Sequence, residues 1–270
     1  STNAIAIGTF AGSTIQGLRA VAVGLLAGQV NQGINAVAIG TEAGRNSQGD
    51  NSVAIGISSG TTSQGIRAIA IGYEAGSSAQ EAGAIAIGQD AGQISQKLSY
   101  IAIGYFAGNS NQSTLAIAIG NSAGASNQAN RAVAIGILAG LSTQSTAAIA
   151  IGNNAGASNQ GSNGVAIGVA AGSSNQSTLA IAIGNQAGIV RQQDRAVAIG
   201  LSAGSSNQST NAIAIGSNAG RSNQGSSGVA IGVAAGQTNQ LTNAVAIGVL
   251  AGSCNQGIYG VSIGWQAGST

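Results

Sequence analysis

Residues 35–50 read NAVAIGTEAGRNSQGD, and residues 51–66 continue with NSVAIGISSGTTSQGI. When residues 1–16 are taken as positions 1–16 of a repeat, glycine fills positions 8 and 12 of every copy. Glutamine fills position 16 of every copy up to Gln256. No insertion or deletion interrupts about seventeen copies, although loops on ordinary domains tolerate both. We therefore expect one solenoid over residues 1–270, in which each copy stacks on the one before it.

The segment A-[IV]-A-[IV]-G at positions 4–8 has the two-residue alternation of a β-strand. A helix is disfavoured, because glycine recurs throughout and each one costs about 1 kcal/mol in a helix. Sixteen residues hold two short strands and two turns. The sequence predicts an all-β fold, a parallel β-solenoid (β-roll) of about seventeen coils with two short strands per coil.

The composition excludes several classes of function. The chain has 5% charged residues and a net charge of +2, which is too little for a nucleic-acid-binding surface. No apolar run approaches the ~18 residues of a membrane-spanning helix, so we expect no membrane insertion by this segment. The chain begins in mid-pattern without methionine, and we interpret it as a fragment or processed segment of a longer chain.

Catalysis is not expected. There is no histidine to act as a base or metal ligand, and the six carboxylates are scattered along the repeats. The G-x-x-A-G motif lacks the lysine of a phosphate-binding loop. We therefore predict no catalytic residues, no metal site, no cofactor and no enzymatic activity.

The alternation places isoleucine and valine on one face of the strand and alanine on the other. We expect the larger side chains to fill the inside of each coil. The predicted core residues are Ile5, Ile7, Val37, Ile39, Val53, Ile55, Ile69 and Ile71. The alanine face carries no charge in any copy and would then be a flat contact surface for identical chains. The predicted interface residues are Ala6, Ala22, Ala38, Ala54, Ala70, Ala86, Ala102 and Ala118.

The glutamine row predicts a ladder of side-chain amides, because an amide carries both donors and an acceptor and can bond to its copy in the next coil. An alternative is that the amides bind sugar. Asparagine often precedes the glutamine, and it suits a corner with left-handed backbone geometry. The predicted ladder comprises Gln16, Gln32, Gln48, Gln64, Gln80, Gln96, Gln112, Gln128, Gln144, Gln160, Gln176, Gln192, Gln208, Gln224, Gln240 and Gln256.

Charged residues occupy few repeat positions. Arg67, Arg131 and Arg195 are four repeats apart, a spacing that duplication of four-repeat blocks explains without a ligand. Asp194 beside Arg195 is interpreted as a local surface pair, which contributes little stability. The single cysteine, Cys254, replaces a serine or threonine and is interpreted as a small packing residue.

The pentapeptide SVAIG at 52–56, its variants AVAIG and AIAIG, and the following x-x-A/S-G resemble the head repeats of trimeric autotransporter adhesins of the YadA type. Similar repeats occur in fibre proteins of phages and large DNA viruses. The resemblance covers essentially all 270 residues. It implies a homotrimer of left-handed β-rolls on a cell or virion surface, and a host receptor, matrix protein or glycan as a partner.

Three functions are compatible with these observations. The first is an extracellular structural fibre or adhesin that self-associates and presents variable outer loops for attachment. The second is an extracellular filament, similar to functional amyloid, in which solenoids stack end to end. The third is an ice-binding solenoid, because low charge and flat regular rows suit that role.

Overall fold

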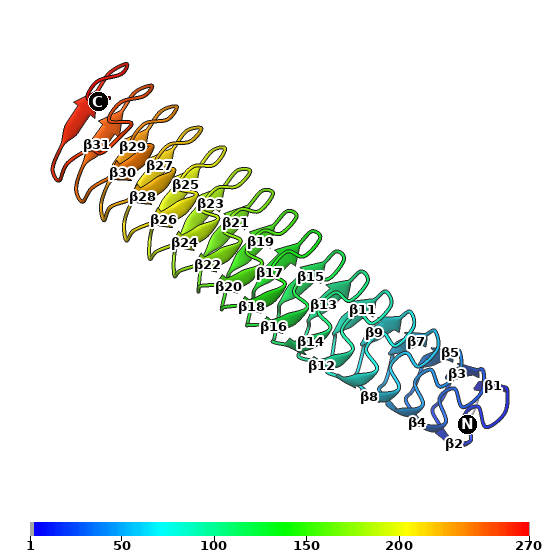
Figure 1. Cartoon of the computed structure of the whole chain (residues 1–270). Coiled ribbons are helices and arrows are strands. Elements are labelled where there is room, and N and C mark those ends of the chain that lie inside the picture. The colour runs from blue at the N-terminus through cyan, green and yellow to red at the C-terminus, as the bar shows by residue number, and fades with distance from the viewer. Residues whose placement is uncertain (1–2, 270) are drawn as a thin grey trace. The chain divides into compact units, whose positions relative to one another are not determined.

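Each sixteen-residue repeat forms one flattened coil with two short strands, as the computed structural model shows for residues 3–269. Figure 1 shows the coils following one another, each with a strand on either side of the coil and a turn at either end. The strands are three residues long because a tight turn interrupts the chain after each of them. We call the sheet formed by the [IV]-A-[IV] segments the first sheet, and the sheet formed by the segments that end in glutamine the second sheet.

Within residues 3–269 the strands of the first sheet are β1 (Ile5–Ile7), β3 (Val21–Val23), β5 (Val37–Ile39), β7 (Val53–Ile55), β9 (Ile69–Ile71), β11 (Ile85–Ile87), β13 (Ile101–Ile103), β15 (Ile117–Ile119), β17 (Val133–Ile135), β19 (Ile149–Ile151), β21 (Val165–Ile167), β23 (Ile181–Ile183), β25 (Val197–Ile199), β27 (Ile213–Ile215), β29 (Val229–Ile231), β31 (Val245–Ile247) and β32 (Val261–Ile263). Those of the second sheet are β2 (Thr14–Gln16), β4 (Val30–Gln32), β6 (Asn46–Gln48), β8 (Thr62–Gln64), β10 (Ser78–Gln80), β12 (Ile94–Gln96), β14 (Ser110–Gln112), β16 (Ser126–Gln128), β18 (Ser142–Gln144), β20 (Ser158–Gln160), β22 (Ser174–Gln176), β24 (Val190–Gln192), β26 (Ser206–Gln208), β28 (Ser222–Gln224) and β30 (Thr238–Gln240).

The chain divides into two units, residues 1–132 and residues 133–270, and each is built in the same way. In the first unit, β5 pairs in parallel with β7, and each residue lies opposite the one sixteen positions later. The second unit repeats this arrangement, for instance between β21 and β23. The second-sheet strands pair by the same rule, as β20 and β22 do. The predicted all-β parallel solenoid with two strands per coil is confirmed.

Two tight turns close each coil. In one, the amide of Ala27 donates to the carbonyl oxygen of Gly24, and in the other the amide of Ala36 donates to that of Gly33. The third residue of each turn has a positive φ, 57° at Leu26 and 56° at Asn35, which is the geometry of a type II turn. Position 15 is also left-handed, with φ 53° at Asn31, so the predicted left-handed corner is confirmed.

The two glycine rows have different physical causes. A Cβ atom on Gly40 would lie 2.6 Å from the carbonyl oxygen of Gly56 in the next coil, so a side chain here would prevent stacking. A Cβ atom on Gly44 would lie 2.7 Å from Oε1 of Gln48 in its own coil. The position-8 row therefore allows the coils to approach one another, and the position-12 row makes room for the glutamine ladder.

The interior of the coil is filled by alanine and glutamine. Alanine at positions 4, 6 and 11 is fully buried in nearly every coil, as at Ala36, Ala38 and Ala43. The isoleucine and valine side chains point the other way, outward from the first sheet. The prediction that they form the core is therefore wrong, and all eight predicted core residues are exposed or half-buried: Ile5, Ile7, Val37, Ile39, Val53, Ile55, Ile69 and Ile71.

The prediction that the alanine face is an intermolecular interface is wrong for the same reason. Seven of its residues are fully buried within the chain itself: Ala22, Ala38, Ala54, Ala70, Ala86, Ala102 and Ala118. The eighth, Ala6, is exposed in the first coil, which has a neighbouring coil on one side only. The cause is the narrow interior, where a Cβ atom added to Gly76 would lie 3.3 Å from the Cβ of Ala70. An isoleucine in place of that alanine would not fit.

The predicted glutamine ladder is present and lies in the interior. Nε2 of Gln160 donates to the carbonyl oxygen of Ile149 at 2.7 Å, to that of Gly164 at 3.1 Å, and to Oε1 of Gln176 at 3.1 Å. The same three contacts recur at Gln176 and Gln192. Each amide therefore joins the two sheets of its coil and also joins its coil to the next one.

Tyr100 interrupts this ladder. It stands at position 4, where nearly all other coils have alanine or glycine, and its ring is fully buried. Its hydroxyl lies 3.3 Å from Oε1 of Gln128, to which it donates, and burial raises the pKa of this phenol well above its usual value. Gln96 is fully buried with neither side-chain polar atom bonded, and Gln112 turns to the carbonyl oxygens of Ser110 and Gly124 instead.

Candidate interaction surface

The outer face of the first sheet is a continuous double row of isoleucine and valine in each unit. Position 5 is half-buried, and position 7 is the more open row, with 40% of Ile39 and 37% of Ile103 exposed. No charged residue occurs at either position in any copy. Because residues of the same type stack at the strand spacing of about 4.8 Å, the two rows form an apolar surface. We call it the Ile/Val face.

Position 9 borders the Ile/Val face, since it follows the strand directly after Gly at position 8. Many copies carry a large apolar residue here, and Leu25, Ile57, Ile137 and Leu201 are each about half exposed. This position is also free of charge throughout the chain. The border therefore extends the apolar surface where it is aliphatic and interrupts it where it is polar.

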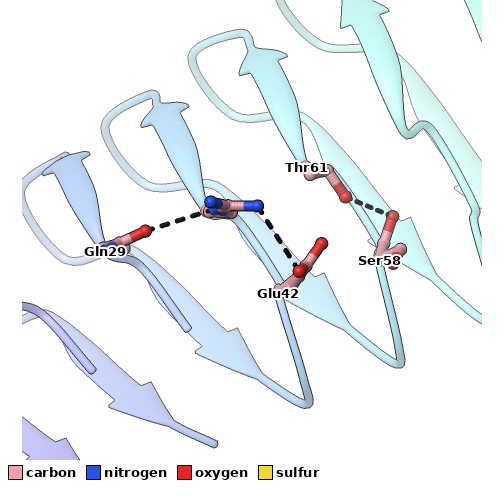
Figure 2. A network of polar contacts seen from close by, with 5 residues as sticks. Gln29, Glu42, Ser58 and Thr61 are labelled. Atoms are coloured by element: carbon pink, nitrogen blue, oxygen red, sulfur yellow. Dashed lines mark hydrogen bonds and ion pairs between the residues drawn. The ribbon is translucent and has the colours of Figure 1, made fainter. Parts of the chain in front are cut away.

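A polar network occupies the other side of this turn in the first unit (Figure 2). Nε of Arg45 donates to Oε1 of Gln29 in the preceding coil at 3.2 Å, and Nη1 of Arg45 lies 3.4 Å from Oε1 of Glu42. In the next coil, the hydroxyl of Thr61 donates to the carbonyl oxygen of Ser58 at 2.6 Å. Both charged side chains are about one-third exposed, so the pair contributes little stability.

Two further carboxylates are held by neutral amides. Nε2 of Gln93 donates to Glu74 and also to Oδ1 of Asp90, the latter at 3.3 Å, and Nε2 of Gln89 donates to Oδ2 of Asp90. The hydrogen bond from Tyr73 to Glu74 and the carboxylate charge raise the pKa of the Tyr73 phenol. Tyr73, Glu74, Gln89, Asp90 and Gln93 therefore form one bonded polar cluster in the first unit.

The remaining predicted residues lie on the surface. Arg67, Arg131 and Arg195 are exposed at the left-handed position of a turn, with φ between 57° and 60°. Asp194 is also exposed. The interpretation of Cys254 as a packing residue is wrong, because its thiol is free and exposed.

A shallow pocket of about 330 Å³ lies at the corner after the second sheet in the second unit. Its lining includes Gly161, the serines Ser145 and Ser177, and the asparagines Asn159 and Asn175. Nδ2 of Asn159 donates to Oδ1 of Asn175 at 3.1 Å, so the exposed amides here are those of asparagine. The glutamines do not offer such a row, since they are buried, and the alternative that they bind sugar is wrong.

The sequence matches no protein-family model and no curated protein sequence. Within residues 3–269, no three histidine, cysteine or acidic residues lie close enough together to hold a metal ion. The described part of the chain also contains no helix that is long and apolar enough to cross a membrane.

The Ile/Val face is the feature that the sequence interpretation placed on the wrong side. The sequence did carry a signal for the correct orientation, because side chains on the two faces of the strand differ in how much their size varies between copies. Position 6 is alanine in all copies but one, whereas position 5 changes between isoleucine and valine. A position that tolerates no change of volume is the mark of a tightly packed interior, since cores respond to a single methylene.

Proposed function

We propose that this chain is a non-catalytic structural segment of an extracellular surface fibre, and that identical copies associate through the Ile/Val face. The β-solenoid fold is compatible with a structural rod or fibre. The observation that carries the proposal is the uncharged double row of isoleucine and valine along the first sheet. Soluble proteins rarely leave a contiguous apolar surface of this kind uncovered.

The size of the surface supports association. Full burial of an isoleucine or valine stabilises by about 1.5–3 kcal/mol, so burying the remaining third of each contributes about 0.5–1 kcal/mol. Two such residues in each of the eight first-sheet strands of residues 1–132 sum to about 8–16 kcal/mol. This matches the cost of about 4–15 kcal/mol for bringing two molecules together.

A second copy of the chain is the partner that fits best. The rows repeat once per coil, at about 4.8 Å, and only a partner with the same axial repeat can match every step. Identical chains have the same axial repeat because they have the same sequence. Residues at the turns and at the corner beside Gly161 remain outside this contact and are available for attachment to a receptor, matrix protein or glycan.

The test is the mass of the purified chain in solution, measured by light scattering. We expect a small multiple of the 25.7 kDa chain mass. The variant I103K/I215K places two lysines on the Ile/Val face, and we expect it to be monomeric. The matched control I94K/V190K places two lysines on the second sheet, at side chains that are similarly exposed, and should keep the oligomer. A monomeric wild-type chain would overturn the proposal.

A further inference from the structure

A pocket of about 420 Å³ in the first unit lies across three successive copies of the same turn. The turn consists of repeat positions 1–3 and joins each second-sheet strand to the first-sheet strand that follows it. Small-molecule sites in proteins have volumes of about 300–1,000 Å³, and this pocket falls within that range. Its lining consists of position 2 of the three copies, which is Ile66, Ala82 and Leu98, and position 3, which is Arg67, Gly83 and Ser99.

The pocket exists because the middle copy lacks the larger side chains of its two neighbours. The amide of Gly83 donates to the carbonyl oxygen of Ile66 at 2.9 Å, and the amide of Ser99 donates to that of Ala82 at 3.1 Å. The three turns are therefore stacked directly on one another. Ile66 and Leu98 are each about half exposed, with the small side chain of Ala82 between them. They form two aliphatic walls that are two strand spacings apart, about 9.6 Å.

Neither the backbone nor the packing requires glycine at residue 83. Its φ is 66°, but leucine takes the same geometry at this position in other copies, with φ 60° at Leu115 and 59° at Leu179. A Cβ atom on Gly83 would lie 3.4 Å from Oγ of Ser99, which is an ordinary contact. The glycine therefore leaves open a space that a side chain could fill.

Arg67 adds an uncompensated positive charge to the pocket. Its side chain is exposed and forms no ion pair within residues 3–269. The carboxylates in the turns directly before and after it are bonded elsewhere. Glu81 pairs with Lys97 at 3.0 Å, and Oδ1 of Asp50 accepts a hydrogen bond from the amide of Ile34 at 2.8 Å. The pocket thus combines two apolar walls with a cation that is free to bind an anion.

We propose that this pocket binds a small aromatic carboxylate. Carbon atoms in contact lie about 4.0–4.5 Å apart, so two walls about 9.6 Å apart hold one layer of atoms, which is the thickness of an aromatic ring. The ring lies over Ala82, between the side chains of Ile66 and Leu98. An aromatic ring is apolar on both faces, and both faces are covered here.

The carboxylate of the ligand lies over Gly83, beside the ring. The guanidinium of Arg67 pairs with it from one side, and the hydroxyl of Ser99 donates to it from the other. The pocket is formed by turn residues and includes no residue of the Ile/Val face. The inference therefore does not depend on the self-association proposed above.

Other arginines at position 3 have the charge without the walls. Around Arg131, position 2 of the three corresponding copies holds Asn130, Thr146 and Ser162, which are all polar. The copies around Arg195 are polar at position 2 as well. These arginines lie in the same left-handed turn as Arg67, so they serve as controls for an effect of charge alone.

The test is titration of the purified chain with sodium benzoate, followed by saturation-transfer NMR. We expect saturable binding with a dissociation constant on the order of 1 mM, as suits so small a ligand. Acetate carries the carboxylate without the ring, and benzyl alcohol carries the ring without the charge. Each should bind about tenfold more weakly than benzoate. Acetate or inorganic sulfate that binds as tightly as benzoate would overturn the inference, because the walls would then contribute nothing.

Three variants locate the site. Arg67→Gln should weaken benzoate about tenfold and leave benzyl alcohol unchanged, whereas the matched control Arg131→Gln should change neither. Gly83→Leu fills the pocket with the residue that Leu115 and Leu179 carry at the same position, so it should keep the wild-type circular dichroism spectrum and lose both ligands. Absence of saturable benzoate binding, or equal losses from Arg67→Gln and Arg131→Gln, would overturn the inference.

Discussion

Replacing Tyr100 by alanine should stabilise the protein, which is the reverse of the usual result for a buried aromatic residue. Removal of a large core side chain ordinarily costs about 3–5 kcal/mol, because a cavity remains. At residue 100, the glutamine side chains of the ladder can fill the space that the tyrosine ring would leave. In coils with alanine at position 4, as at Ala180, the glutamine side chains of the ladder fill the interior.

The magnitude follows from the polar groups that Tyr100 disturbs. Both polar atoms of Gln96 and Oε1 of Gln112 are buried without a hydrogen bond. Each such atom costs about 1–3 kcal/mol, which sums to about 3–9 kcal/mol. With alanine at residue 100, both glutamines can adopt the arrangement of Gln160 and bond to the ladder. Set against the lost burial of the ring, the net change should be a gain of about 1–3 kcal/mol in the free energy of unfolding.

The assay is guanidinium-induced unfolding followed by circular dichroism, combined with hydrogen exchange of the amides around β12 and β13. Hydrogen exchange reports the local effect, which a global transition can average out in a repeat protein. We expect a higher unfolding midpoint and slower exchange near Gln96. The reciprocal variant Ala180→Tyr should lower the midpoint, because it introduces the same interruption beside Gln176 and Gln192.

A second substitution, at Gln96, tests the same explanation, because its effect on stability should have opposite signs in the two backgrounds. Gln96→Met keeps an unbranched side chain but removes the two unbonded polar atoms. It should stabilise the wild-type protein by about 1–3 kcal/mol and destabilise Tyr100→Ala by a similar amount, since the amide is bonded only in the latter. A loss of 3–5 kcal/mol on Tyr100→Ala, with Gln96→Met acting equally in both backgrounds, would refute the account.

Three further predictions follow from single positions. Above pH 10, Tyr100 should lower the free energy of unfolding by up to about 1.4 kcal/mol per pH unit, because its phenol loses its proton in the unfolded chain while burial raises its pKa in the folded state. Tyr100→Phe should make the slope shallower in pH-dependent denaturation and leave the contribution of Tyr73, whose pKa Glu74 raises. Thr143→Asn should raise the free energy of unfolding by about 1 kcal/mol, and Asn159→Thr should lower it by as much, as measured by chemical denaturation. Both residues have a left-handed backbone, which β-branched residues disfavour. A change of the same sign in both variants would contradict this. Gly156→Ala should cost more than about 2 kcal/mol, since its Cβ would meet Gln160 at 2.6 Å, whereas Gly257→Ala, which has no atom within 4 Å of its Cβ, should leave the unfolding midpoint unchanged.

Much of the fold could be predicted because the repeat dictates it. A strict spacing with no insertions requires stacking in register, and glycine at positions 8 and 12 requires turns. The ladder followed from the chemistry of the amide, which can bond to its own copy. These inferences depend on spacing and on local backbone chemistry, and both are properties of the sequence alone.

The direction of the side chains could not be predicted by the same means. Alternation shows that Ala38 and Ile39 lie on opposite faces, but it does not say which face is inside. The rule that large apolar residues are buried works in one direction only, since much of any protein surface is apolar. The deciding quantity is the width of the coil, which depends on Gln48 pointing inward and on the space left beside Gly44. That width is a tertiary property.

The placement of alanine inside the coil and of isoleucine and valine outside it affects how the molecule is stabilised. Alanine buries little area, so the interior of one coil contributes less hydrophobic stabilisation than an isoleucine core would. The hydrogen bonds of the glutamine ladder hold the coils together, while the largest apolar side chains remain outside and half-exposed. The largest apolar surface of the chain is therefore left open to further burial. In the self-association that we propose, a second copy with the same repeat covers this surface at every level, and folding and assembly of the chain would then be linked.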